Sequence, residues 1–392
     1  MTLAFFPSSK GRQRGMSLIE LLIALVLSLV VLIGLSSVYV AVKQSFRFQE
    51  NTGRLQEDAN FALDNISRDL RMAGFAGCSG IKKVVIGTNP PVYYPGSVLS
   101  SGSPGGINGA NPLAQIETSA AEVILQPFTA MNFVRGFDSV PSGMFASGSA
   151  PATNGTDSLF FAGGSASSVA VSTAMSTTTS PLTIATDTYG WRNATANGGA
   201  YNMIISDCTS SSIFDGKVSV AGGITTIAHD TGLANTSASF TSDHLFGPDA
   251  IVMLAQWNFF YVATRPGAST PSLYRVVFNG NTRLAAEEIV SNVESMQLHY
   301  GENTTADSLG FPTLLVDEWR TTAASVADWS RVVAVRVGLM MVSAEDRTSS
   351  DVILTTPTML GQAYTLPTGA STTRLRKEFS TTVVLRNSVA AR

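Results

Sequence analysis

Charged residues are scarce in this sequence: they make up 14% of its 392 residues, and the formal net charge is −3. A chain without a basic patch lacks the electrostatic footprint of a nucleic-acid-binding protein. It has only two cysteines, Cys78 and Cys208, and its three histidines (His229, His244 and His299) are scattered without metal-ligand spacing. We therefore expect no metal site and no nucleic-acid partner.

Motifs of the common enzyme classes are also missing. The sequence has no Gly-rich phosphate loop, no Gly-x-Ser-x-Gly elbow, no His-Glu-x-x-His and no Cys-x-x-Cys. The pairs Gly163-Gly164 and Gly222-Gly223 lie in polar stretches, and we interpret both as turns. We expect neither a catalytic site nor a cofactor. The 34 glycines and abundant Ser, Thr and Ala favour an exported, β-rich protein with polar loops.

The N-terminus, in contrast, contains a long apolar run. Leu21–Val42 is 22 residues without a charge, and Lys10, Arg12 and Arg14 precede it. As a helix it is about 33 Å long, enough for a bilayer core of roughly 30 Å. Basic residues stay on the cytoplasmic side, so we expect the N-terminus inside and the chain after Lys43 outside.

A secretory signal and a plain signal anchor also contain an apolar run. A secretory signal has an apolar region of about 7–15 residues followed by a small-residue cleavage site. This run is longer, and Ser45-Phe46-Arg47-Phe48 follows it without such a site. A plain signal anchor is compatible with hydropathy alone.

The residues just before the run, Gly15-Met16-Ser17-Leu18-Ile19-Glu20, resemble the class III signal of type IV prepilins. The resemblance implies cleavage after Gly15, N-methylation of Met16 and a role for Glu20 in assembly. Met16 departs from the family, which usually has Phe there. Near the middle of a bilayer a carboxylate costs about 2.5–3.5 kcal/mol, which a neighbouring subunit's N-terminal amine would offset. Alternatively, Glu20 only complements the helix dipole, worth under about 1 kcal/mol.

An amphipathic pattern follows the apolar run. Apolar residues recur at steps of three and four: Leu55, Ala59, Ala62, Ile66 and Leu70. No proline lies between Pro7 and Pro90, so we predict one helix over Leu18–Met72. We expect possible bends at Gly34 and Gly53, and an end at Gly74 and Gly77.

Several later segments resemble the PilW-type minor pilins: Leu63–Cys78, Ile205–Cys208, Ser272–Arg275, Val290–Gly301 and Arg376–Asn387. The resemblance covers the first 80 residues and much of the last 150. It implies a pilin-like α+β fold, in which one long helix, transmembrane in its first half, packs on an antiparallel β-rich head.

Strand patterns agree with this plan. Phe259–Thr264 and Leu273–Phe278 flank a turn at Arg265-Pro266-Gly267, and Phe379–Leu385 is a closing strand. Alternation from Val333 to Leu339 predicts a half-buried strand. Two short apolar pieces, Val123–Leu125 and Leu159–Phe161, are further candidate strands.

We divide the chain into a leader (1–15), an assembly helix (16–42), its amphipathic continuation (43–75) and the head (76–392). The head has a Ser/Thr/Gly-rich insertion at about 88–200, which is either an exposed variable face or loop without a binding role.

The function that the resemblance implies is that of a minor pilin, a non-enzymatic subunit that primes or caps a type IV pilus. Motility, adhesion or DNA uptake would lie downstream. Expected partners are other minor and major pilins, the prepilin peptidase and the inner-membrane assembly platform. Expected locations are the inner membrane and then the pilus on the cell surface. Two alternatives stay open: a minor pseudopilin of a type II secretion system, and a signal-anchored periplasmic binding protein.

Cys78 and Cys208 both follow the membrane span and hence belong to the oxidising periplasm. We expect a disulfide between them, with two buried free thiols as the alternative.

The leader motif generates a direct prediction. The mature protein should begin at N-methylated Met16, and a bulky residue in place of Gly15 should leave full-length precursor in the inner membrane. Intact-mass analysis of the purified membrane form checks this. A chain that starts at Met1, or that is cut beyond Val42, would exclude the prepilin interpretation.

Overall fold

The structure is a computed structural model that describes residues 15, 17–77, 96–97, 133–139, 155–185, 190–191, 200–207, 210–231, 233, 235, 238–240, 244–279, 282–305, 315–344 and 357–387. The chain forms two compact units, Met1–Thr52 and Gly53–Arg392. Helix α1 contributes to both units, and all described strands belong to the second.

Helix α1 runs without interruption from Leu18 to Leu70. The predicted helix is thus confirmed, with its end two residues earlier, and Gly34 and Gly53 do not break it. Turns follow the helix, and Gly74 and Gly77 have positive φ angles of 74° and 86°. Glycine adopts such angles without steric cost, which ends the helix where the sequence predicts.

In the first unit the helix is apolar and exposed. Its large apolar side chains between Leu18 and Val42 are 47–77% exposed. This part of the helix is long and apolar enough to cross a membrane.

In the second unit the helix buries one face. Its buried residues are the predicted ones (Leu55, Ala59, Ala62, Ile66 and Leu70), together with Leu63 and Ser67. They join a core with strand residues such as Val335, Val337 and Val383. Each fully buried aliphatic side chain contributes about 1.5–3 kcal/mol, so this face fixes the helix on the sheet.

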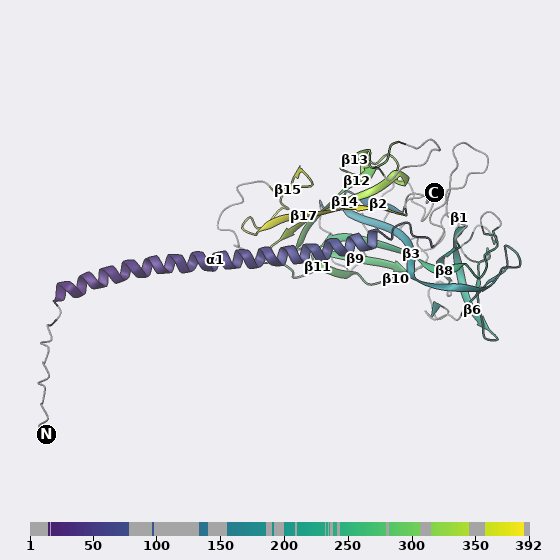
Figure 1. Cartoon of the computed structure of the whole chain (residues 1–392), viewed down its shortest axis with the longest axis horizontal. Coiled ribbons are helices and arrows are strands. Elements are labelled where there is room, and N and C mark those ends of the chain that lie inside the picture. The colour runs from purple at the N-terminus through teal and green to yellow at the C-terminus, as the bar shows by residue number, and fades with distance from the viewer. Residues whose placement is uncertain are drawn as a thin grey trace, which may run out of the picture. The chain divides into compact units, whose positions relative to one another are not determined.

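The sheet under the helix has four antiparallel strands. Their order is β13 (Glu318–Arg320), β12 (Val293–Glu302), β14 (Val332–Val342) and β17 (Arg376–Val384). Figure 1 shows β14 and β17 along the second half of α1. The predicted closing strand is therefore confirmed as β17. Short 3₁₀ helices, η5 (Ala323–Ser325) and η6 (Trp329–Arg331), precede β14.

A second, larger sheet has the order β10 (Thr282–Arg283), β9 (Ser272–Asn279), β8 (Ile251–Ala263), β5 (Ala200–Ser206), β6 (Ser211–Ala221), β7 (Ile224–Ala228), β4 (Leu182–Ile184), β3 (Ser158–Thr173) and β2 (Val134–Phe137). In addition, β11 (Glu287–Ser291) pairs with β9, and β1 (Gly96–Ser97) pairs with β6. A separate hairpin joins β15 (Thr358–Met359) and β16 (Gln362–Ala363).

Part of this sheet closes on itself, because β8 pairs with both β5 and β3. The ring β8-β5-β6-β7-β4-β3 is therefore a small barrel. Its interior is filled by apolar side chains, among them Met203, Phe214, Phe240 and Phe246. A filled barrel of this kind is a packed core without a channel.

The Ser/Thr/Gly-rich stretch supplies a strand of this barrel. Gly163 and Gly164 lie inside β3, so the prediction of a turn there is wrong. Gly74 N–H donates to Ala162 C=O at 2.8 Å, and a Cβ on Gly163 would lie 2.6 Å from Met72 C=O. The glycines are needed because the chain leaving α1 crosses β3 in close contact. The turn at Gly222-Gly223, between β6 and β7, is confirmed.

Of the other strand predictions, some are confirmed and one is wrong. The hairpin of β8 and β9 is confirmed, and Leu159–Phe161 lies in β3. Val123–Leu125 lies outside the described residues. The prediction that β14 is half-buried is wrong, because every β14 residue except Arg336 is buried. The face opposite the helix is covered by the β15–β16 hairpin, whose Leu360 lies against Gly338.

Asp157 joins the two sheets. Its N–H donates to Met296 C=O at 2.8 Å, and its carboxylate accepts from Leu298 N–H at 2.7 Å. Burial is the main cause that raises the pKa of Asp157 to about 7; the hydrogen bond from Leu298 opposes this rise, and the charge of nearby Asp138 adds to it.

This raised pKa predicts a pH dependence. The folded state binds this proton more tightly than the unfolded chain does. The resulting stabilisation is fully present below the unfolded pKa, and it is lost as the pH rises toward 7. The loss is at most about 4 kcal/mol. Asp157→Asn keeps an acceptor for Leu298 without a charge, so it should remove this loss. Thermal unfolding midpoints of both proteins between pH 4 and 7 measure this loss of stability. Parallel pH curves for the wild-type protein and Asp157→Asn would contradict the prediction.

Candidate functional site

The processing segment lies at the start of α1. Gly15 and Ser17 are exposed, and Met16 lies outside the described residues. Ser17 C=O accepts from the N–H groups of Glu20 and Leu21, at 3.0 and 3.2 Å, which begins the helix. Glu20 is exposed in the first turn, and it is the only charged residue from Ser17 to Val42.

Within the part of the chain that the structure describes, no cation pairs with the Glu20 carboxylate. The helix N-terminus carries a partial positive charge that this carboxylate complements. The geometry is compatible both with that local role and with pairing to another subunit.

The other end of α1 is fixed by ionic contacts. Arg275, in β9, donates to Asp69 of α1 at 2.6 Å and to Glu287 of β11 at 2.7 Å. The side chains of Arg275 and Asp69 are only 21% and 15% exposed. A charged pair so poorly exposed to water is screened little by salt, so it fixes the last turn of the helix against the sheet.

Backbone groups after the helix are also satisfied from far along the chain. Asn387, just after β17, donates its Nδ2–H groups to the C=O groups of Arg71 and Ala73, both at 3.2 Å. Gly164 N–H donates to Phe75 C=O at 2.6 Å. Backbone carbonyls outside regular secondary structure need hydrogen-bond partners, and here Asn387 and β3 provide them for the turns that follow the helix.

A buried ion pair joins the starts of β12 and β17. Arg376 donates to both carboxylate oxygens of Glu294, at 2.6 and 2.8 Å, and the two side chains are 1% and 6% exposed. Tyr364 donates its hydroxyl to Glu294 at 3.1 Å. Burial, and then the charge of Glu294, raise the pKa of Tyr364, which keeps it protonated as a donor.

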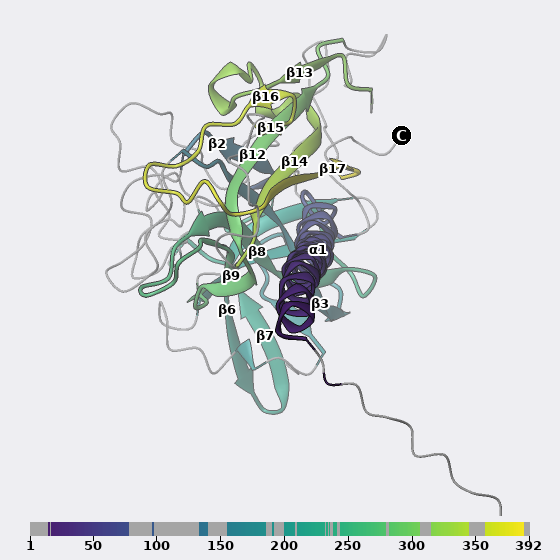
Figure 2. The same cartoon turned by 90° about the vertical axis from the view of Figure 1, so that its left-hand side faces the viewer.

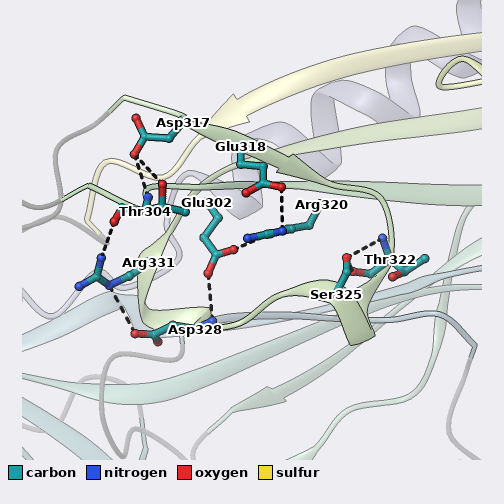
Figure 3. A network of polar contacts seen from close by, with 9 residues as sticks. All are labelled: Glu302, Thr304, Asp317, Glu318, Arg320, Thr322, Ser325, Asp328 and Arg331. Atoms are coloured by element: carbon teal, nitrogen blue, oxygen red, sulfur yellow. Dashed lines mark hydrogen bonds and ion pairs between the residues drawn. The ribbon is translucent and has the colours of Figure 1, made fainter.

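A polar network lies at the other end of β12 (Figure 3). The buried carboxylate of Glu302 accepts from Arg320 Nε at 2.7 Å and from Asp328 N–H at 3.0 Å. Asp317 accepts from the N–H groups of Thr304 and Thr305, both at 2.8 Å. Hydrogen bonds from Thr305 hold the pKa of Asp317 below its usual value. Because each carboxylate is satisfied within the chain, the network holds loops in place.

Metal ligands do not gather anywhere in the described residues: no group of three or more His, Cys, Asp or Glu side chains is arranged to hold an ion. Cys78 and Cys208 lie outside the described residues, but their neighbours are close together. A Cβ on Gly77 would lie 2.6 Å from the Cβ of Ser206.

Comparison with known families gives two matches. Residues 259–387 match the model of the Type IV Pilus-assembly protein W family, PilW, and residues 10–36 match the prokaryotic N-terminal methylation motif. The two matched segments are similar to those of a prepilin-like type IV pilin of the PilW family. No curated protein and no solved structure matches the chain. The motif and the apolar helix indicate membrane anchoring.

Five residues that hold α1 or the four-stranded sheet lie in the PilW segment: Arg275, Glu287, Glu294, Arg376 and Asn387. All except Glu287 lie in segments that resemble the PilW-type minor pilins, but the sequence did not predict which residues they contact. Asp69 and Arg275 are 206 residues apart, and Glu294 and Arg376 are 82 apart. Charge pattern alone does not reveal pairs at such separations.

The contact between α1 and β9 predicts a stability effect. Arg275→Ala leaves the carboxylates of Asp69 and Glu287 without this partner, and should lower the free energy of unfolding by about 2–3 kcal/mol. The control is Arg265→Ala: Arg265 is 65% exposed and pairs with Glu288 at 3.4 Å. That change should cost under about 1 kcal/mol. Urea unfolding at fixed pH compares them, and equal losses would refute the ranking.

Proposed function

We propose that this protein is a minor pilin, a low-abundance subunit that primes or caps the assembly of a type IV pilus. The observation that carries the proposal is the exposed apolar half of α1, which follows the methylation motif and continues unbroken into a head with the PilW segment. Motility, adhesion or DNA uptake would follow from the filament.

The physical reason lies in the two halves of the helix. Side chains that are 47–77% exposed from Leu18 to Val42 need an apolar environment. The inner membrane supplies it before assembly, and neighbouring pilin helices supply it in the filament. The second half already has its partner, the head's own sheet.

The proposed partners follow from this route. The prepilin peptidase cuts after Gly15, the assembly platform receives the mature chain, and other minor and major pilins surround its helix. The chain itself performs no catalysis in this role, because cleavage and the energy for assembly come from other proteins. After assembly the head lies on the cell surface.

Glu20 supplies the direct test of assembly. Glu20→Ala should still be cut and methylated but should fail to enter filaments, because the carboxylate that meets a neighbour's Met16 amine is missing. Glu20→Gln is the matched control for side-chain length without charge and should fail too. Immunoblots of sheared pili, normalised to the membrane level, measure this. If either variant reaches wild-type amounts in sheared pili, then Glu20 only complements the helix dipole and is not needed for assembly.

We also propose a Cys78–Cys208 disulfide. The contact between Gly77 and Ser206 supports it, because Cys78 follows Gly77 directly and Cys208 stands two residues after Ser206. Such a bond would join the end of the α1 segment to β5, and would stabilise the head by up to about 5 kcal/mol in the chain-entropy model for a loop of about 130 residues.

Non-reducing peptide mapping of protein from an oxidising periplasm should find the linked pair. Cys78→Ser should then lower the melting temperature and the steady-state level without affecting leader cleavage. Two alkylatable thiols would refute the bond.

A further inference from the structure

The two edges of the four-stranded sheet differ in how they are protected. The β13 edge is three residues long and has Glu318 and Arg320 at its ends, which pair with each other. Short length and charge are the usual devices that prevent an edge from pairing with another chain. The opposite edge is β17, with nine residues.

The register shows which backbone groups of β17 are free. Leu385 N–H donates to Val333 C=O, and Ser343 N–H donates to Leu375 C=O, both at 2.8 Å. In an antiparallel pair, alternate residues face the partner strand, so the odd-numbered residues of β17 bond to β14. The N–H and C=O groups of the even-numbered residues point to the outer edge: Arg376, Glu378, Ser380, Thr382 and Val384. In the described part of the chain, no strand pairs with that edge.

The composition of this edge favours pairing. From Phe379 to Leu385 the sequence FSTTVVL has no charge, proline or glycine, and four of its residues are β-branched. Its pairing with β14 is regular over all nine residues, without a bulge that would twist the edge away. Ser380 and Thr382 are exposed, and Val384 is 44% exposed. From Phe379 onward the edge is exposed, regular and uncharged, and an edge of this kind is a template for another strand.

The edge also lies beside the second half of α1. Val383 and Leu385 belong to the same core as Leu55 and Leu70 of α1, and Asn387 is bonded to the carbonyls that follow the helix. Figures 1 and 2 both show β17 next to the second half of α1. A neighbour packed against this second half of α1 would thus meet the β17 edge as well.

We propose that the free edge of β17 accepts an extended, uncharged strand from a neighbouring pilus subunit, which adds to the sheet through main-chain hydrogen bonds. The proposal rests on the proposed function and names the element that a neighbour contacts. Strand addition of this type obtains its affinity from the backbone and its specificity from alternate side chains. The uncharged side chains of Ser380, Thr382 and Val384 select a partner strand without charges.

A pair of β17 strands from two copies is a poorer fit. Antiparallel pairing about a two-fold axis would turn the α1 segments of the two copies in opposite directions, because β17 ends where that segment ends. Subunits anchored in one membrane share one direction. A different subunit with its own extended strand meets this constraint.

The test blocks the edge without disturbing β14. Thr382→Pro removes an N–H that β14 does not use, and proline is accepted on edge strands. The control Thr382→Val keeps that N–H. Both changes remove the bond that Thr382 Oγ1 accepts from Arg336 Nε at 3.3 Å. Equal thermal midpoints for the full chain in detergent establish that both variants fold alike. If Thr382→Pro melts lower, Thr382→Lys, which places a charge on the edge, replaces it.

Each variant also carries a photo-cross-linking residue at Ser380. In the control we expect an adduct with another pilus subunit in membranes and filaments. The blocked edge should lose it, with about tenfold less protein in sheared pili than the control, equivalent to about 1.4 kcal/mol. Equal assembly and an unchanged adduct would overturn the proposal, as would an adduct within the same chain or with a second copy.

If the control itself is absent from pili, the proposed function fails independently. The cross-linked adduct in membranes is then the only test of strand addition at the β17 edge. Loss of the adduct in the blocked variant supports strand addition, and its persistence refutes strand addition.

Discussion

Burial of one face of α1 is the interaction on which the head depends. Ala59 and Ala62 let the helix approach the sheet closely, while Leu55, Ile66 and Leu70 fill the space beside them. Both sheets contribute to the core under this face. The position of the helix therefore determines where β14 and β17 lie, and where the chain crosses β3 after the helix. Since the same helix continues into the apolar segment, the head is organised around an element that also serves as the anchor.

Polar contacts then make this packing specific. The ion pairs Arg275–Asp69 and Arg376–Glu294 have little exposure, so removing one partner would leave a charge in a poorly solvated place. Asn387 completes the set by bonding carbonyls that follow the helix. Contacts of this kind favour one register of helix on sheet over alternatives that bury a similar apolar area. Arg275, Glu294, Arg376 and Asn387 all lie in the PilW segment, so this segment supplies much of what holds α1.

The two sheets differ in whether their edge strands are paired. Closure of six strands into a barrel satisfies the backbone groups between β3 and β8, which a Ser/Thr-rich stretch with few charges needs in order to stay soluble. The four-stranded sheet stays open and leaves β17 regular on its outer side and uncharged from Phe379 onward. One part of the head is therefore complete by itself, whereas the other has backbone groups available for a further strand.

The amino-acid sequence is enough to predict the leader motif, the length of α1, its buried line of residues and the strands near the C-terminus. These are local patterns, in which hydrophobic period, charge and glycine position act within a few residues. Tertiary structure alone decided that Gly163 and Gly164 lie in a strand, that β14 is covered on both faces, and that β3 and β8 close a barrel. It also decided the pairing of Asp69 with Arg275 and of Glu294 with Arg376. Each of these features depends on which distant segment of the chain lies opposite. The residues around a glycine or a charged side chain look the same whether it lies in a loop or contacts a partner about 200 residues away.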